Sequence, residues 1–270
     1  MKKYFLTFHT IFIMDEHVEW IEEFLIYYIN LGFEQFYLYD NTGSIGNNRG
    51  GPRAAPSPRK ARRNGETTKY GFPIIKKDPE IWRHIYHKYE KYITYIKWQP
   101  TNEQGQIVYG INNSSLDGII KFIKDFKHEA EWCYVGDFDE FVFSPTNDDL
   151  LTLINSTTQP IITLHQKIFS HKCLTSEKFI TQEFKCINIP KPFDNTYGGQ
   201  KNIIKLDLIS GVRSCHSFKG RNKVMPLEQW RFNHYNFCPR SKKRLDQEKW
   251  KYELTVDDSM KKYKNLFNET

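Results

Sequence analysis

The chain has 270 residues, of which 39% are hydrophobic, 16% aromatic and 26% charged. This composition is typical of a globular protein and excludes a wholly disordered chain, which would contain few aromatic residues. No apolar run reaches the roughly 18 residues that a membrane-spanning helix needs, so no transmembrane segment is predicted. The five cysteines lack CxxC spacing, which argues against a zinc site and a disulfide framework and favours a reducing compartment. We therefore expect a soluble cytoplasmic protein.

Basic charge is concentrated in one segment. The formal net charge is +7, and nine basic residues with a single glutamate lie between Gly43 and Lys77, so the rest of the chain is near neutral. Residues 43–70 are rich in Gly, Pro, Ser and Asn, and such a segment cannot bury enough surface to offset its ordering entropy. We predict a disordered basic insertion loop there. It either contacts phosphate, an anionic surface or an acidic partner, or is a solvated insertion with no partner.

The first half of the chain alternates between strand and helix patterns. Its N-terminal apolar run resembles a short signal peptide, but polar residues interrupt it and no small-residue cleavage site follows, so we predict a buried strand. Apolar positions recurring at three and four predict helices, and apolar β-branched or aromatic runs predict strands. In chain order we expect strand 4–13, helix 17–31, strand 36–39, helix 79–92, strand 94–98, helix 106–128 and strand 132–135.

This order predicts an α/β fold with a Rossmann-type, mostly parallel sheet and helices on both of its faces. The second half has short strand patterns at 160–168, 179–189, 203–208 and 212–218, with helix patterns at 147–154 and 241–252. We infer a mixed or antiparallel C-terminal extension of the sheet. There is no internal repeat, and a shared sheet favours a single domain over residues 1–270.

The most informative stretch is Val135-Gly136-Asp137-Phe138-Asp139-Glu140-Phe141, where a strand pattern ends in an acidic cluster. In a parallel sheet, ligands bind beyond the carboxyl ends of the strands, which places Asp137 and Asp139 at the ligand crevice. Neighbouring carboxylates repel one another and are costly to bury uncompensated. A divalent cation such as Mn²⁺ or Mg²⁺ removes this cost, and substrate phosphates complete its shell. The alternative is an exposed acidic turn.

A second polar strand end lies at Asp40 and Asn41, directly after the pattern at 36–39. An acidic side chain at such a place is suited to hold a nucleoside. No Gly-x-Gly-x-x-Gly follows either strand and no Gly-Lys-Ser/Thr occurs, so both glycine-rich phosphate motifs are absent. We therefore expect any bound nucleotide to be held through a metal.

Several short segments fall in an order that matches a known family. They are residues 15–21, 31–33, 36–41, Trp98, Gln106, Tyr109, 136–141, 201–204, His216 and 233–235. Together they span most of residues 4–250 and resemble the glycosyltransferases of GT-A type, near family 92, its domain-of-unknown-function-23 relatives and family 2-like enzymes. The acidic stretch resembles the family's Asp-x-Asp-Glu-Phe, with Gly136 where Ile is more usual.

The resemblance implies a metal-dependent hexosyltransferase with a GT-A-like fold. Its donor would be a UDP-sugar, and characterised relatives use UDP-galactose. The acceptor would be the hydroxyl of a glycan or another molecule, and transfer would invert the anomeric carbon. Mn²⁺ or Mg²⁺ would stabilise the leaving diphosphate as a Lewis acid.

Site roles follow from the same resemblance. Asp139 is the expected direct metal ligand, and Asp137 would bridge to the ribose or to metal-bound water. His234 would be a third ligand, the alternatives being a structural role for it and ligation by His216. Lys201 and Lys205 could meet the diphosphate, and the alternative for either is a solvated lysine.

Inversion also needs a general base near the acceptor hydroxyl. The carboxylates considered are Glu183, Glu177, Glu228 and Asp194. Glu183 is favoured, because it lies in a strand-like run whose order resembles the family's segment after the metal motif.

Two other classes of function compete with this interpretation. A metal-dependent phosphoesterase or nuclease also uses clustered carboxylates, but it would need more acidic ligands converging from several strands. A module that binds nucleic acid or an anionic surface could be built on residues 43–70. Charge in one low-complexity segment supports only weak, non-specific binding, so no specific nucleic-acid partner is predicted.

Overall fold

The computed structural model describes residues 2–18, 20–44, 79–108, 115–170, 181, 186–190, 199–235, 252–257 and 259–267. Almost all of the predicted basic loop at 43–70 lies outside these ranges, as does Glu183. Among the described residues, none of the helices combines the length and hydrophobicity that crossing a bilayer takes.

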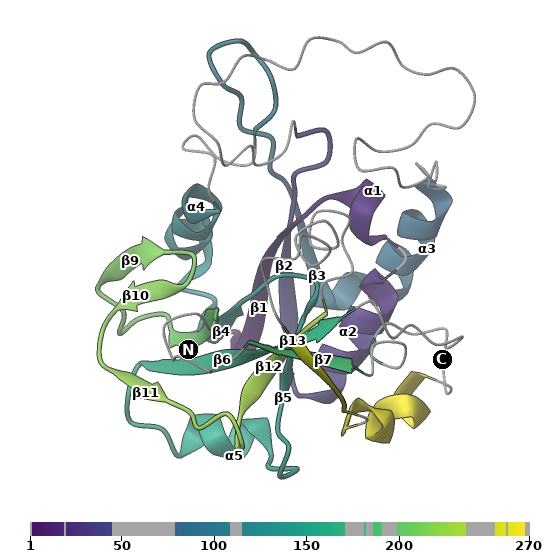
Figure 1. The fold of residues 1–270 in the computed structure, drawn as a ribbon. Coiled ribbons are helices and arrows are strands. Elements are labelled where there is room, and N and C mark those ends of the chain that lie inside the picture. Colours follow the sequence, from purple (N-terminus) through teal and green to yellow (C-terminus); the bar gives the residue numbers. More distant parts are fainter. Residues whose placement is uncertain are drawn as a thin grey trace, which may run out of the picture.

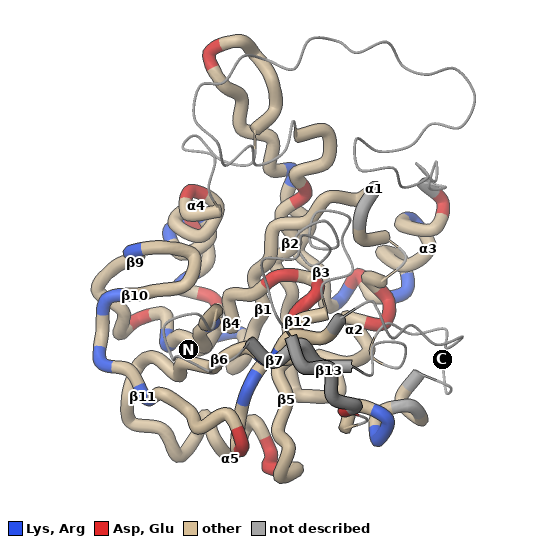
Figure 2. Tube along the Cα trace, viewed as in Figure 1, with Lys and Arg blue, Asp and Glu red and all other residues tan. Residues whose placement is uncertain are grey.

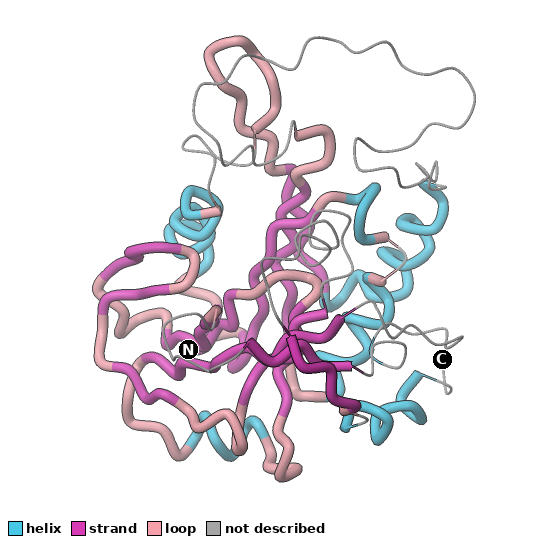
Figure 3. Tube along the Cα trace, viewed as in Figure 1, coloured by secondary structure: helices cyan, strands magenta, loops and turns pink. Residues whose placement is uncertain are grey.

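A large, curled mixed sheet forms the centre of the described fold (Figures 1 and 3). Its N-terminal part has the spatial order β3-β2-β1-β4, and all neighbours in it are parallel. The strands are β1 (Tyr4–Phe12), β2 (Gln35–Asp40), β3 (Ile93–Lys97) and β4 (Ala130–Val135). Because they are parallel, all four present their carboxyl ends at the same edge of the sheet.

The C-terminal part of the sheet mixes both strand directions. β8 (Gln200–Lys205) joins β4 antiparallel, and β6 (Ile161–Ser170), β7 (Cys186–Pro190) and β13 (Tyr252–Val256) follow in that order. β12 (Arg231–Tyr235) pairs parallel with β6 and antiparallel with β5 (Glu140–Phe143), and β11 (Asn222–Val224) also pairs with β6. A separate hairpin is made by β9 (Gly211–Ser214) and β10 (Ser217–Lys219). The predicted α/β class with a mixed C-terminal extension is confirmed.

Helices cover both faces of the parallel strands (Figure 1). One apolar core joins β1 to α2 (Ile21–Asn30), α3 (Pro79–Tyr89) and η3 (Ser259–Phe267), and the other joins β1 to α4 (Leu116–Phe126). The period-two alternation of a strand explains this, because Phe8 and Phe12 belong to the first core and Ile11 to the second. The remaining helices are α1 (Met14–His17), η1 (Glu90–Tyr92) and α5 (Leu150–Asn155).

Several predicted boundaries were wrong. The strand expected at 203–208 begins earlier, at Gln200, because the polar residues Lys201 and Asn202 are buried in the sheet. The strand expected at 212–218 is a hairpin that turns at Cys215 and His216. The N-terminal part of the helix expected at 106–128 is not helical where it is described, since Ile107 forms a bridge with Thr101. Thr181 is helical, which contradicts the strand expected there, whereas the described residues of β7 are strand as expected.

Positive charge outside the basic loop is unevenly spread. Residues 211–224 contain four basic side chains and no acidic one. They lie on β9, β10, β11 and the turn before β11, at one edge of the molecule (Figure 2): Arg213, Lys219, Arg221 and Lys223. None of them forms an ion pair with another described residue. A cationic edge of this kind attracts anions from solution.

A buried ion pair fixes the C-terminal segment to the sheet. The carboxylate of Asp257, whose side chain is 12% exposed, lies 3.0 Å from the guanidinium of Arg231 and 2.9 Å from the ammonium of Lys167. Burial alone would raise the pKa of Asp257, but hydrogen bonds from Lys167 and Ser259 outweigh it and lower this pKa to about 2.

This lowered pKa predicts a loss of stability in acid. Between about pH 2 and pH 4 the carboxyl takes up a proton as the chain unfolds, so its contribution is complete above the unfolded pKa near 4 and is lost as the pH falls towards 2. We expect a contribution of about 2 kcal/mol to the free energy of unfolding at pH 7. Urea unfolding measured from pH 7 to pH 2.5 should show the free energy of unfolding falling with pH in the wild type. The fall should be smaller in Asp257→Asn. Equal slopes would contradict the assignment.

Candidate functional site

The acidic cluster lies at the carboxyl edge of the parallel strands, in the turn that joins β4 to β5. Glycine is required at position 136, because an added Cβ would lie 2.4 Å from the ring of Tyr134. The turn is closed by its own polar groups. The amide of Glu140 donates to the carbonyl of Asp137 at 3.2 Å, and the amide of Asp137 donates to the Glu140 carboxylate at 3.0 Å. The cluster is therefore a built turn at the expected edge of the sheet.

Lys201 enters this turn from β8. Its ammonium lies 2.6 Å from the carboxylate of Asp137 and 3.1 Å from that of Glu140. The register between β4 and β8 explains the contact, since Val135 is opposite Asn202. The side chains of Lys201 and Glu140 are 4% and 3% exposed, whereas that of Asp137 is 48% exposed. One buried cation thus neutralises part of the charge, and Asp137 faces solvent.

Burial and pairing shift the pKa values of all three groups. The buried part of the Asp137 carboxyl favours its neutral form, but the charge of Lys201 outweighs this and lowers the pKa of the half-exposed carboxyl. Burial raises the pKa of Glu140, and Lys201 offsets only part of this effect. The pKa of Lys201 is raised by the two carboxylates, although burial alone would lower it. Lys201 therefore remains an ammonium at neutral pH.

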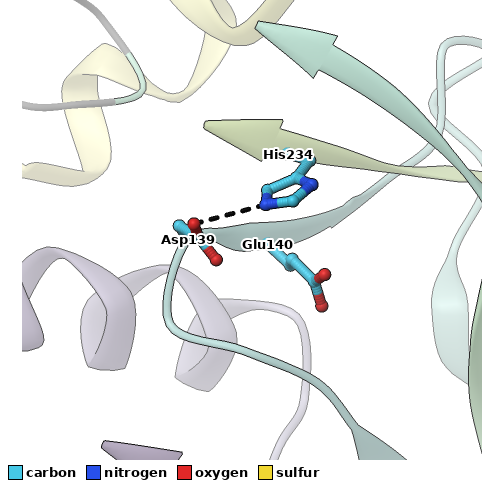
Figure 4. A group of neighbouring side chains, drawn as sticks. All are labelled: Asp139, Glu140 and His234. Carbon is cyan, nitrogen blue, oxygen red and sulfur yellow. Dashed lines mark hydrogen bonds and ion pairs between the residues drawn. The ribbon is translucent and has the colours of Figure 1, made fainter. Parts of the chain in front are cut away.

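His234 meets Asp139 on the other side of the turn (Figure 4). Its Nε2 lies 3.3 Å from the Asp139 carboxylate, and the two side chains point toward each other. The ladder between β5 and β12 places them, because His234 is opposite Glu140 and the amide of Tyr235 donates to the carbonyl of Asp139 at 2.7 Å. Burial alone would lower the pKa of His234, but Asp139 raises it above the usual value.

Gln166 sets the orientation of the His234 ring. The Nδ1 of His234 lies 3.1 Å from the side-chain oxygen of Gln166 and donates to it, while Nε2 donates to Asp139. The Gln166 bond keeps the proton on Nδ1, so the neutral ring is formed by loss of the Nε2 proton, which frees a lone pair on that nitrogen for a cation. The amide of Gln166 fits because residue 199 is glycine, where an added Cβ would lie 2.9 Å from the Gln166 oxygen. This tautomer is the one that a metal-ligating histidine needs.

The donor atoms present fit a divalent cation. Ligand atoms of Asp139, Glu140 and His234 all lie within 4.8 Å of one another. Carboxylate oxygens with one imidazole nitrogen suit Mn²⁺ and, with more water, Mg²⁺. One oxygen of Glu140 already accepts from both Lys201 and Asp137, and Figure 4 shows its carboxylate turned to one side of the other two groups. Asp139 and His234 are therefore the better placed pair.

The second strand end has a different arrangement. Asn41 is fully buried, and its amide nitrogen donates to the carbonyls of Trp98 and Val108 at 2.8 and 3.0 Å. Its amide nitrogen thus anchors the chain beyond β3. Asp40 is buried and accepts hydrogen bonds from the hydroxyls of Thr42 and Tyr95, which fix its carboxylate at the edge of the sheet. Nucleoside binding by this pair remains a prediction.

The other residues named from the sequence are spread more widely. His216 lies beside β8, with its Nδ1 3.0 Å from the carbonyl of Gln200, and its charge helps to lower the pKa of Asp137. Glu228 is exposed. Glu183, Glu177 and Asp194 lie outside the described residues. The base at Glu183 therefore remains a prediction.

Sequence reasoning missed two groups near the cluster. Gln166 belongs to a polar run, His165-Gln166-Lys167, within an otherwise apolar strand, and that run was a usable signal. His9 is buried on β1, and neither of its ring nitrogens has a hydrogen-bond partner among the described residues. Burial lowers the pKa of His9 to about 3, so the ring is neutral. Its position within an apolar run gave no sign of its place behind the acidic turn.

Comparison with known protein families found no family that matches the chain, and a search of curated proteins found no relative.

Proposed function

We propose that this protein is a metal-dependent glycosyltransferase of the GT-A type, which transfers a hexose from a UDP-sugar to a hydroxyl acceptor. The observation that carries the proposal is the meeting of Asp139 with His234, which is 95 residues further along the chain. It occurs beyond the carboxyl end of β4, where an α/β sheet of order β3-β2-β1-β4 binds ligands. The acidic turn, the buried lysine and the oriented imidazole together support a cation and a diphosphate.

Each group has a role under this proposal. Mn²⁺ or Mg²⁺ held by Asp139 and His234 would supply Lewis-acid stabilisation of the charge that grows on the leaving diphosphate. Asp137 presents its solvent-facing carboxylate to the ribose or to water, while Lys201 holds that carboxylate in place. The ammonium of Lys201 also adds positive potential where the diphosphate would lie. Asp40 offers its fixed carboxylate to the nucleoside.

A donor-hydrolysis assay tests the proposal. The protein is incubated with UDP-galactose, and in parallel with UDP-glucose and UDP-N-acetylglucosamine, in the presence of Mn²⁺. Nucleotide products are then separated and measured. We expect slow release of UDP that stops when a chelator is added and resumes when excess Mn²⁺ is restored.

The identity of the product separates the two enzyme classes. Cleavage at the anomeric carbon releases UDP, whereas a phosphoesterase that attacks the pyrophosphate releases UMP and a sugar phosphate. Release of UMP would reject the transferase in favour of the phosphoesterase. Absence of nucleotide release and of Mn²⁺ binding would reject both.

A further inference from the structure

β5, which begins at Glu140 in the acidic turn, pairs on only one side. Among the described strands, β5 pairs with β12 alone. Its other edge would leave buried backbone groups without partners, which is costly in an apolar interior. Helix α2 lies along this edge, and two consecutive tyrosines of α2 supply the missing partners. Both tyrosines are fully buried.

The two tyrosines hold different parts of β5. The hydroxyl of Tyr28 donates to the carbonyl of Glu140 at 2.6 Å and accepts from the amide of Val142 at 3.1 Å. The hydroxyl of Tyr27 donates to the carbonyl of Val142 at 2.6 Å. Tyr28 therefore bonds the backbone at the start of the strand, next to Asp139, whereas Tyr27 bonds it two residues further on.

The bonds of Tyr28 complete a two-sided support. On the β12 side, the amide of Tyr235 holds the carbonyl of Asp139 at 2.7 Å. On the α2 side, Tyr28 holds the carbonyl of the next residue, Glu140. The backbone that carries Asp139 and Glu140 is thus fixed from both edges, and β12 is also the strand that carries His234.

We propose that Tyr28 is a positioning residue for the metal site formed by Asp139 and His234, acting through the backbone of Glu140, and that Tyr27 only stabilises the fold. The inference rests on the proposed function in so far as that function needs a metal. Groups outside the ligand set that orient it typically alter metal affinity by 10- to 100-fold when they are removed. A geometric error at such a site also lowers the rate of the chemistry.

The two tyrosines allow a matched comparison. Tyr28→Phe and Tyr27→Phe each remove one buried hydroxyl from the same helix and keep the ring packing. Mn²⁺ affinity is measured on the purified full chain by electron paramagnetic resonance of the free ion. Exchange of the Tyr235 amide, which reports on the carbonyl of Asp139, is measured by NMR without metal. Thermal unfolding of both variants provides the stability reference.

We expect both variants to unfold at a lower temperature than the wild type. Tyr28→Phe should weaken Mn²⁺ binding by about tenfold and speed Tyr235 amide exchange beyond its loss of global stability, whereas Tyr27→Phe should keep Mn²⁺ affinity within about twofold. Equal Mn²⁺ affinities in the two variants would overturn the inference. If the wild type binds no Mn²⁺, the metal-dependent function fails, and the exchange measurement then decides whether Tyr28 positions this backbone. Equal exchange in both variants would reject that role as well.

Discussion

Replacing Asp139 by Asn should reduce Mn²⁺-dependent release of UDP from a UDP-sugar by a factor on the order of 10³. The substitution keeps the size of a buried side chain and removes its charge. The cation therefore loses a ligand, and the leaving diphosphate loses the stabilisation that the cation supplies, while the turn remains folded. The variant should also lose its response to chelator. The measurement is the initial rate of UDP release at saturating Mn²⁺, with thermal unfolding to show that the fold is intact.

An exposed aspartate provides the control for this experiment. Asp148 lies in the loop before α5, and Asp148→Asn makes the same chemical change at the surface. We expect this variant to release UDP at the wild-type rate. Wild-type activity in Asp139→Asn would show that the carboxylate takes no part in the reaction, and the proposed function would lose the observation that carries it.

Replacing Lys201 by Met should lower the free energy of unfolding by about 3–5 kcal/mol at pH 7.5. The change leaves Glu140 buried without its counter-ion and removes the partner that holds Asp137. The pKa of Glu140, already raised in the wild type, should rise further, and that of Asp137 should lose its lowering, so the folded variant binds more protons than the folded wild type. The stability of the variant should therefore fall more steeply than that of the wild type as the pH rises. Urea unfolding at pH 5 and pH 8 measures both effects.

Lys205 is the matched control, because it lies on the same strand and also pairs with a glutamate. Its pair with Glu131 is partly exposed, at 33% and 36%, so Lys205→Met should cost less than about 1 kcal/mol. A double variant, Lys201→Met with Glu140→Gln, should regain part of the lost stability, since it removes one of the unpaired charges. A loss in Lys201→Met no larger than in Lys205→Met would show that the buried pair is not essential to the fold.

The parallel half of the fold was predictable because local pattern determines it. The strand patterns ending near Tyr39 and Val135 are short, apolar and followed by polar turns, and parallel strands share one carboxyl edge. The position of Asp137 and Asp139 at that edge therefore followed from the sequence.

The partners of these carboxylates depend on contacts between distant segments. Lys201 was expected at a diphosphate, whereas the register of β8 against β4 brings its ammonium to Asp137 and Glu140. Nothing in the local sequence of Tyr28 indicates that its hydroxyl closes the edge of β5. Strand register and the packing of a helix against a strand depend on the whole fold, so they cannot be predicted from a short segment of sequence.

Gly199 shows how a residue distant in sequence affects the metal site, because it leaves room for the Gln166 side chain that orients His234. The atoms nearest to a methyl group at this position belong to the end of the Gln166 side chain, which is flexible, so we expect an alanine there to cost little free energy of folding. The displaced amide would no longer accept the proton of His234 Nδ1, and that proton would be free to move to the other nitrogen. A substitution that hardly changes the melting temperature would then weaken His234, on β12, as a metal ligand. It would do so without changing any residue that faces the cation.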